Sequence, residues 1–169
     1  MSQTYTRSDV LAAIAAAAAQ LGERKEEINR LNVFPVPDGD TGTNMSLTLK
    51  SVVDNIAKLS DGASSAEVRR AITTGALMGA RGNSGVITSQ ILRGLCEGYA
   101  DAGELSTATV DAAFSRAVEV AFQAVRKPVE GTILTVVKDM AAAAKHARKK
   151  KLSADEALEC IVEEGYASV

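Results

Sequence analysis

Asp38 and Asp40 lie two residues apart in the segment Asn32–Ser46, which also contains two prolines. Gly39 and Gly42 allow the backbone to turn sharply around this acidic pair. Carboxylate oxygens are the ligands that a hard cation such as Mg²⁺ prefers. Free N–H groups at a helix start attract phosphate. The segment therefore has the chemistry to bind a nucleotide together with its metal ion.

A simpler interpretation of Asp38 and Asp40 stays open at this point. Asp and Gly are common in turns, and an Asp before a helix often only caps it. The loop is long for a simple helix connection, however. Apolar residues then recur at helical spacing from Met45 to Leu59, so the acidic pair lies at the mouth of a predicted helix.

A second glycine-bounded helix start is predicted at Gly82–Gly85, where Asn83 and Ser84 add side-chain donors. Helical spacing of apolar residues follows it. Taken alone, this segment is equally explained by a Gly-rich turn between two packed helices. Two such starts in one small chain favour a single phosphate site built from both.

Helical patterns account for most of the chain, and no convincing period-two segment appears. Ser64 with Glu67 and Ser153 with Glu156 have the spacing of capping boxes. Short connections predict antiparallel neighbours, so the expected fold is an all-α, up-and-down helical bundle. Seven helices are expected. Five of them are placed by their first residues, at or near Ser8, Ser64, Ser106, Thr132 and Ser153. The second helix is expected over residues 43–59, and the fourth from just after Gly85 to about Gly98.

The length of 169 residues predicts one domain over residues 1–169. The composition excludes several classes of function. Hydrophobic residues make up 46% but aromatic residues only 4%, and such small side chains suit closely packed helices. A net charge of −2 predicts no nucleic-acid partner. No apolar run approaches the roughly 20 residues that span a bilayer, so no membrane insertion is expected. Cys96 and Cys160 lack metal-ligand spacing, which indicates a reduced, cytoplasmic environment.

The basic segment Lys145–Lys151 ends a predicted helix and contains His146, the single histidine. Cations at a helix C-terminus interact favourably with its dipole. We expect a solvated helix end here, with a partner-docking patch as the alternative. No catalytic role is assigned to His146.

Four segments taken together resemble the dihydroxyacetone kinase L-subunit (DhaL-like) family, and most closely the N-terminal ATP-binding domain of fatty acid kinase A. These segments are Leu31-Asn32, Pro37–Met45, Gly82–Gly85 and Lys127–Thr132. The resemblance covers essentially the whole chain, and the run NxFPVPDGDTGTNM is its most specific part. It implies an antiparallel barrel of eight helices with the nucleotide held at one end.

The resemblance also implies roles for single residues. Asn32, Asp38 and Asp40 would hold one or two Mg²⁺ ions, with Asp38 and Asp40 as the catalytic residues that position and neutralise the transferred phosphoryl group. Asn32 and Thr41 stand where the dihydroxyacetone branch has Asp and His, which favours the fatty acid kinase branch. The implied nucleotide-binding residues are Thr41, Gly42, Thr43, Asn44, Asn83 and Ser84, with Ala124, Thr132 and Ile133 nearer the adenine.

The activity implied is that of an ATP-dependent kinase, with ATP and ADP as its nucleotides. The acceptor would be a fatty acid presented by a DegV-type lipid-binding protein. Two alternatives stay open: a dihydroxyacetone (glycerone) kinase L-type subunit working with a separate K subunit, and a non-catalytic nucleotide-binding helical module. The oligomeric state is open, with a homodimer as one option. The family's eighth helix and closing Gly-rich segment lie beyond residue 169, so we expect weak turnover by this chain alone.

Overall fold

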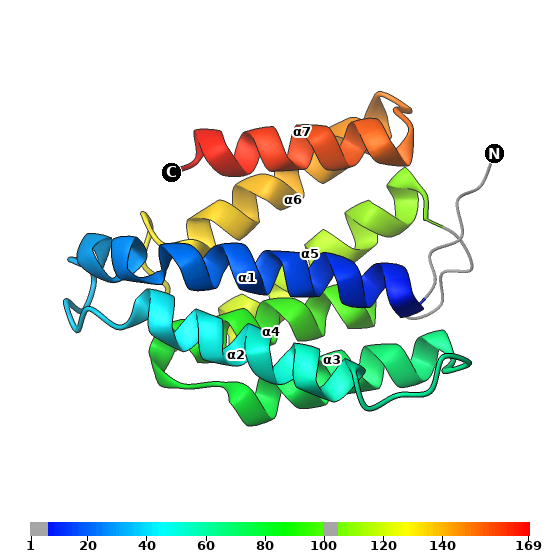
Figure 1. Cartoon of the computed structure of the whole chain (residues 1–169). Coiled ribbons are helices and arrows are strands. Elements are labelled where there is room, and N and C mark those ends of the chain that lie inside the picture. Colours follow the sequence, from blue (N-terminus) through cyan, green and yellow to red (C-terminus); the bar gives the residue numbers. More distant parts are fainter. Residues whose placement is uncertain (1–6, 100–104) are drawn as a thin grey trace. The chain divides into compact units, whose positions relative to one another are not determined.

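The computed structural model describes residues 7–99 and 105–169, and this part of the chain contains seven α-helices and no strand (Figure 1). The all-α fold class predicted from the sequence is confirmed. The helices fall into two compact units, with the boundary between Leu92 and Arg93, and each unit is described by itself. That the whole chain forms one domain stays a prediction. Among the described helices, none combines the length and the apolar character needed to cross a membrane.

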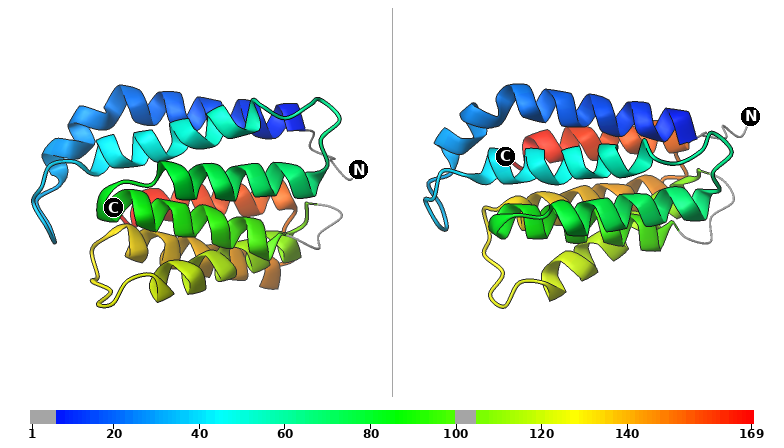
Figure 2. Two further views of the ribbon diagram at one scale, coloured as in Figure 1. Left: turned by 90° about the horizontal axis from the view of Figure 1, so that it is seen from below. Right: turned by 60° about the horizontal axis from the view of Figure 1, so that its bottom comes forward.

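The first unit consists of three complete helices and the beginning of a fourth. Helix α1 lies beside α2 and α2 lies beside α3, with neighbours running antiparallel (Figures 1 and 2). Val52 and Ile56 are fully buried. Gly75 brings the α3 backbone against α2, since an added Cβ would lie only 2.8 Å from Val52 Cα. The helices are α1 (Arg7–Leu31), α2 (Thr41–Ile56), α3 (Ser65–Gly79) and α4 (Gly82–Gly98).

The second unit contains the end of α4 and three further helices. Helix α6 packs against both α5 and α7, and α5 also contacts α7. Its core is formed by one buried residue from each of these helices, Val110, Ala144 and Ile161, with Phe114 and Met140 packed around them. The helices are α5 (Thr107–Gln123), α6 (Ile133–Lys149) and α7 (Ala154–Ala167).

Four helices begin with a capping box made by residues close in sequence. The two boxes predicted at α3 and α7 are confirmed. Hydrogen bonds from the Ser64 hydroxyl and then its backbone N–H hold the pKa of Glu67 below its ordinary value of 4.5. The backbone N–H of Ser153 and then its hydroxyl do the same for the pKa of Glu156. These helix starts are satisfied by their own residues.

Three predicted helix bounds are wrong. Helix α2 begins at Thr41 rather than at residue 43, because Gly42 packs against the Lys25 backbone of α1 within the first turn instead of turning the chain. It ends at Ile56 rather than at residue 59, since Leu59 N–H bonds the carbonyl only three residues back, at 3.0 Å. Helix α4 begins at Gly82 rather than after Gly85.

Candidate functional site

The acidic loop, residues 32–40, lies between α1 and α2, at the same end of the first unit as the turn between α3 and α4 (Figure 2). Its shape is held by contacts within the loop. Asn32 Nδ2 and the Asp38 N–H both donate to the Val36 carbonyl, each at 3.0 Å. Gly39 has a φ of +65°, a conformation that favours glycine. The loop therefore turns just before α2 and leaves Asp38 exposed.

Asn32 holds an amide oxygen that has no partner in the described part of the chain. Its Nδ2 donates to Val36, whereas its Oδ1 is buried and unbonded. A buried acceptor without a partner is costly. This oxygen is therefore suited to a cation or to a donor that a ligand would bring.

Asp40 is the N-cap residue of α2, but its side chain makes no capping hydrogen bond. The simpler interpretation, in which this carboxylate only caps the helix, does not match the structure. Asp40 is half-buried, and its charge lies at the positive end of the α2 dipole. Both oxygens are thus left for a ligand.

Only some of the backbone donors at the α2 start are hydrogen-bonded within the protein. Within the described residues, the N–H groups of Thr41 and Gly42 have no partner. The Thr43 N–H donates to Asn29 Oδ1 at 3.2 Å, and the Asn44 N–H donates to the Asp40 carbonyl at 2.9 Å. The amides that remain for an anion are those of Thr41 and Gly42.

The α4 start lies directly against the α2 start. The Ser84 hydroxyl donates to the Thr41 carbonyl over 3.4 Å. An added Cβ on Gly85 would lie 2.9 Å from Thr48 Oγ1 and 3.4 Å from the Asn44 carbonyl. Only glycine permits so close an approach of the two helices. The two predicted starts are therefore brought together in space.

Gly82, the first residue of α4, packs closely against the side chains of Asp40 and Asn44. Its φ is +57°, and an added Cβ would overlap the Asn44 side-chain amide and lie 3.5 Å from Asp40 Oδ2. The Asn44 side chain is 6% exposed, and its Nδ2 has no partner in the described part of the chain. Asn83, the residue after Gly82, is exposed. A buried, unpaired donor thus lies next to an uncommitted carboxylate.

The kind of metal ion that suits the acidic loop depends on the ligand atoms that its side chains offer. In residues 7–99 and 105–169, no group of three or more His, Cys, Asp or Glu side chains could hold a metal ion. The loop offers the carboxylates of Asp38 and Asp40 and the amide oxygen of Asn32, so its ligands are all oxygen. Such ligands suit Mg²⁺ and not the soft metals that prefer thiolate.

Three of the predicted nucleotide-binding residues belong to the second unit. Their position relative to the acidic loop and the starts of α2 and α4 stays a prediction. Ala124 is exposed at the C-cap of α5, and Ile133 is the half-buried first residue of α6. Thr132 caps α6, because its hydroxyl accepts from the Leu134 N–H at 3.3 Å and donates to the Val129 carbonyl at 2.8 Å. The Thr132 hydroxyl is thus already occupied.

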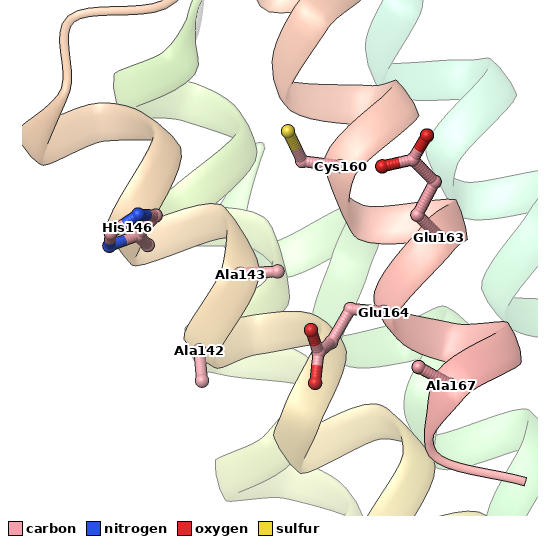
Figure 3. Close-up of a pocket in the computed structure, with 7 residues that line it drawn as sticks. All are labelled: Ala142, Ala143, His146, Cys160, Glu163, Glu164 and Ala167. Atoms are coloured by element: carbon pink, nitrogen blue, oxygen red, sulfur yellow. The ribbon is translucent and has the colours of Figure 1, made fainter.

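An open hollow of about 480 Å³ lies between α6 and α7, within the second unit (Figure 3). His146, Cys160, Glu163 and Glu164 line it together with three alanines. None of the predicted site residues lies there. Cys160 is a free thiol.

Asn29 contacts the site but was not predicted from the sequence. It lies in the last turns of α1, and its side chain makes two hydrogen bonds to Thr43. An Asn near the end of a helix is a weak helix former, and this is the only signal that the sequence offers.

Comparison with known proteins gives two findings. The family described as DAK2 domain matches residues 35–169. Uncharacterized proteins of Staphylococcus aureus, from strains USA300 and N315, are 47% identical over 131 residues, which is 75% of this chain and 23% of each relative. The chain therefore spans about a quarter of the length of these curated relatives.

Proposed function

Because the chain belongs to the DAK2 domain family, we propose that it binds ATP or ADP with Mg²⁺ at the starts of α2 and α4 and transfers the γ-phosphoryl group of ATP. One observation carries the proposal. The uncommitted Asp40 carboxylate adjoins both helix starts and the unpaired Asn44 amide. A carboxylate alone would repel phosphate, whereas a carboxylate that holds a cation beside free amides suits a metal-chelated phosphate.

The metal would be held by Asn32, Asp38 and Asp40. The buried, unpartnered Oδ1 of Asn32 supports this assignment, although a neutral amide compensates less cation charge than a carboxylate. When bound, Mg²⁺ neutralises charge on the phosphate oxygens. No protein nucleophile is required, since phosphoryl transfer depends mostly on positioning and charge stabilisation.

The residues at the two helix starts would position the phosphates. The N–H groups of Thr41 and Gly42 would donate to phosphate oxygens, as would the Asn44 side chain. The Ser84 hydroxyl is held by a hydrogen bond of 3.4 Å to Thr41, which is long enough to be exchanged for a phosphate oxygen. Asn83, exposed in the same turn, would add a further donor.

We propose a fatty acid carboxylate as the acceptor, presented by a DegV-type lipid-binding protein. Asn32 and Thr41 support this choice, because they differ from the Asp and His of the dihydroxyacetone branch. The carboxylate oxygen would attack the γ-phosphorus, the bond from that phosphorus to the ADP oxygen would break, and the products would be an acyl phosphate and ADP.

Calorimetric titration tests the nucleotide site. ATP and ADP should bind in a Mg²⁺-dependent way, and AMP should bind much more weakly because it lacks the outer phosphates. A Ser153→Ala variant, altered at the capped start of α7, serves as the control and should bind as the wild type does. Binding that is indifferent to Mg²⁺, or equal for AMP and ATP, would contradict the proposal.

Mass spectrometry of the reaction products tests the acceptor. The assay supplies ATP and Mg²⁺ with either a fatty-acid-loaded DegV-type protein or dihydroxyacetone on a K subunit. An acyl phosphate supports the proposal, whereas dihydroxyacetone phosphate assigns the chain to the other branch. No product with either acceptor, in a protein extended to the length of its relatives, would leave a nucleotide-binding module without transfer activity.

A further inference from the structure

Asn29 of α1 makes a two-point contact with Thr43 in the first turn of α2. Its Oδ1 accepts from the Thr43 N–H at 3.2 Å, and its Nδ2 donates to Thr43 Oγ1 at 2.9 Å. Both side chains are half-buried. Through this pair a side chain of α1 contacts the candidate phosphate site, and α1 lies along α2 in Figure 1.

The chemistry of the two groups fixes the direction of both bonds. A backbone N–H can only donate, so the Asn29 atom that faces it must be the carbonyl oxygen. The other Asn29 atom is therefore the NH₂ group, which also can only donate. Thr43 Oγ1 must then accept, and its own proton has to point to another acceptor.

Among the described residues, no hydrogen bond has the Thr43 hydroxyl as its donor. Thr43 and Asp40 are three residues apart at a helix start, so their side chains share one face of α2. The hydroxyl proton is thus available on the face that carries the uncommitted carboxylate of Asp40.

We propose that Asn29 is a positioning residue that turns the Thr43 hydroxyl into an obligate donor toward a phosphate oxygen of the nucleotide. The inference rests on the proposed function and names a residue beyond the acidic loop and the helix starts. Asn29 also occupies the Thr43 amide, which leaves the hydroxyl as the only group through which Thr43 can bind an anion.

Two substitutions separate this role from a merely structural one. Asn29→Asp keeps the acceptor for the Thr43 N–H but removes the donor to Oγ1, so the hydroxyl would donate to the new carboxylate and not to the ligand. Asn29→Ala removes both bonds but leaves the hydroxyl proton free to donate. Stability and affinity should therefore rank the two variants in opposite orders.

The measurements are the melting temperature without ligand and the Kd for Mg·ATP by calorimetry. Asn29→Ala should melt about 2–6 °C below the wild type, and Asn29→Asp should melt above Asn29→Ala. In contrast, Asn29→Asp should weaken Mg·ATP by about tenfold or more, and Asn29→Ala by only about threefold. Thr43→Val, which has no hydroxyl to donate, separates this effect from charge repulsion. It should also weaken Mg·ATP about tenfold, and adding Asn29→Asp to it should weaken binding little further, whereas charge repulsion alone would act equally in both backgrounds.

Each result decides a separate point. If affinity follows stability, with Asn29→Asp binding better than Asn29→Ala, Asn29 is only a structural tie and the inference is wrong. If both variants bind as the wild type does, the Thr43 hydroxyl does not contact phosphate. If the wild-type protein itself fails to bind ATP, the proposed function fails, and the order of melting temperatures still decides whether Asn29 anchors Thr43.

Discussion

Helices α2 and α3 lie side by side, but their first turns are capped in different ways. At α3 the cap is local, because Ser64 and Glu67 satisfy each other's backbone N–H groups. At α2 the residue in the same position, Asp40, makes no capping bond, and Asn29 of α1 takes the Thr43 amide. In the local cap of α3, the Ser64 hydroxyl and the Glu67 carboxylate are both engaged in hydrogen bonds. In α2 the capping bond comes from another helix, so the carboxylate of Asp40 stays available to a ligand.

The largest effect is expected from Asp40→Asn. Asn is as good a helix cap as Asp, so the unliganded protein should lose only about 0.3–1 kcal/mol through the helix dipole. Removing the charge should weaken Mg·ATP by about 100-fold or more, which exceeds the usual effect of changing a residue around a metal site. Calorimetry and thermal unfolding of the same variant check both values. Unchanged Mg·ATP affinity would show that the Asp40 carboxylate does not contribute to nucleotide binding.

Gly82→Ala should have the next largest effect, because the α4 start depends on a residue without a side chain. The positive φ and the overlap with Asn44 predict a stability loss of about 1–3 kcal/mol and about tenfold weaker nucleotide binding. Gly22→Ala in α1 is the matched control. Nothing lies within 4 Å of an added Cβ there, so it should stabilise by about 0.5–1 kcal/mol. Equal stability of the two variants would contradict the close approach at Gly82.

Ser64→Ala tests the other half of the comparison. Loss of the local cap should lower the stability of the protein by about 1 kcal/mol, seen as a melting temperature about 2–4 °C lower. Mg·ATP affinity should not change, since Ser64 bonds only within the α3 start. A change in affinity would mean that the two helix starts are coupled.

The smallest effect is the acid sensitivity of the local cap. Because the folded-state pKa of Glu67 is lowered from 4.5, its contribution to stability is complete above that value and is lost as the pH falls through the lowered pKa. Glu67→Gln should therefore melt below the wild type at neutral pH, and the two should converge in acid. Thermal melts from pH 7 to pH 2 measure this, and a difference that persists at pH 2 would rule the linkage out.

The local features could be predicted from the sequence. The capping boxes at Ser64 and Ser153 depend on residues three positions apart, so their spacing alone reveals them. The acidic pair and the second helix start are also recognisable in the sequence, because each precedes apolar residues at helical spacing. The structure brings Asp40, Gly82 and Ser84 together, while their roles in binding stay predictions.

The parts that escaped prediction depend on contacts between distant residues. The role of Asn29 requires that α1 pack on α2 in one register, and no local pattern contains that register. The sequence pattern places the start of α2 two residues late, because Gly42 looks like a turn residue. It is in fact a packing residue, since an added Cβ would overlap the Lys25 carbonyl of α1. Only the tertiary structure distinguishes these two uses of glycine.

The cap that α1 supplies to α2 also bears on the order in which this part of the chain becomes structured. A peptide of residues 64–79 carries its own start signal, whereas a peptide of residues 40–56 lacks the partner of its Thr43 amide, 14 residues upstream. Ordering the first turn of α2 therefore requires closure of the intervening loop, with its entropic cost. That turn should form together with the α1–α2 hairpin and fray when the hairpin loosens. A nucleotide bound there would act as a clamp on the hairpin.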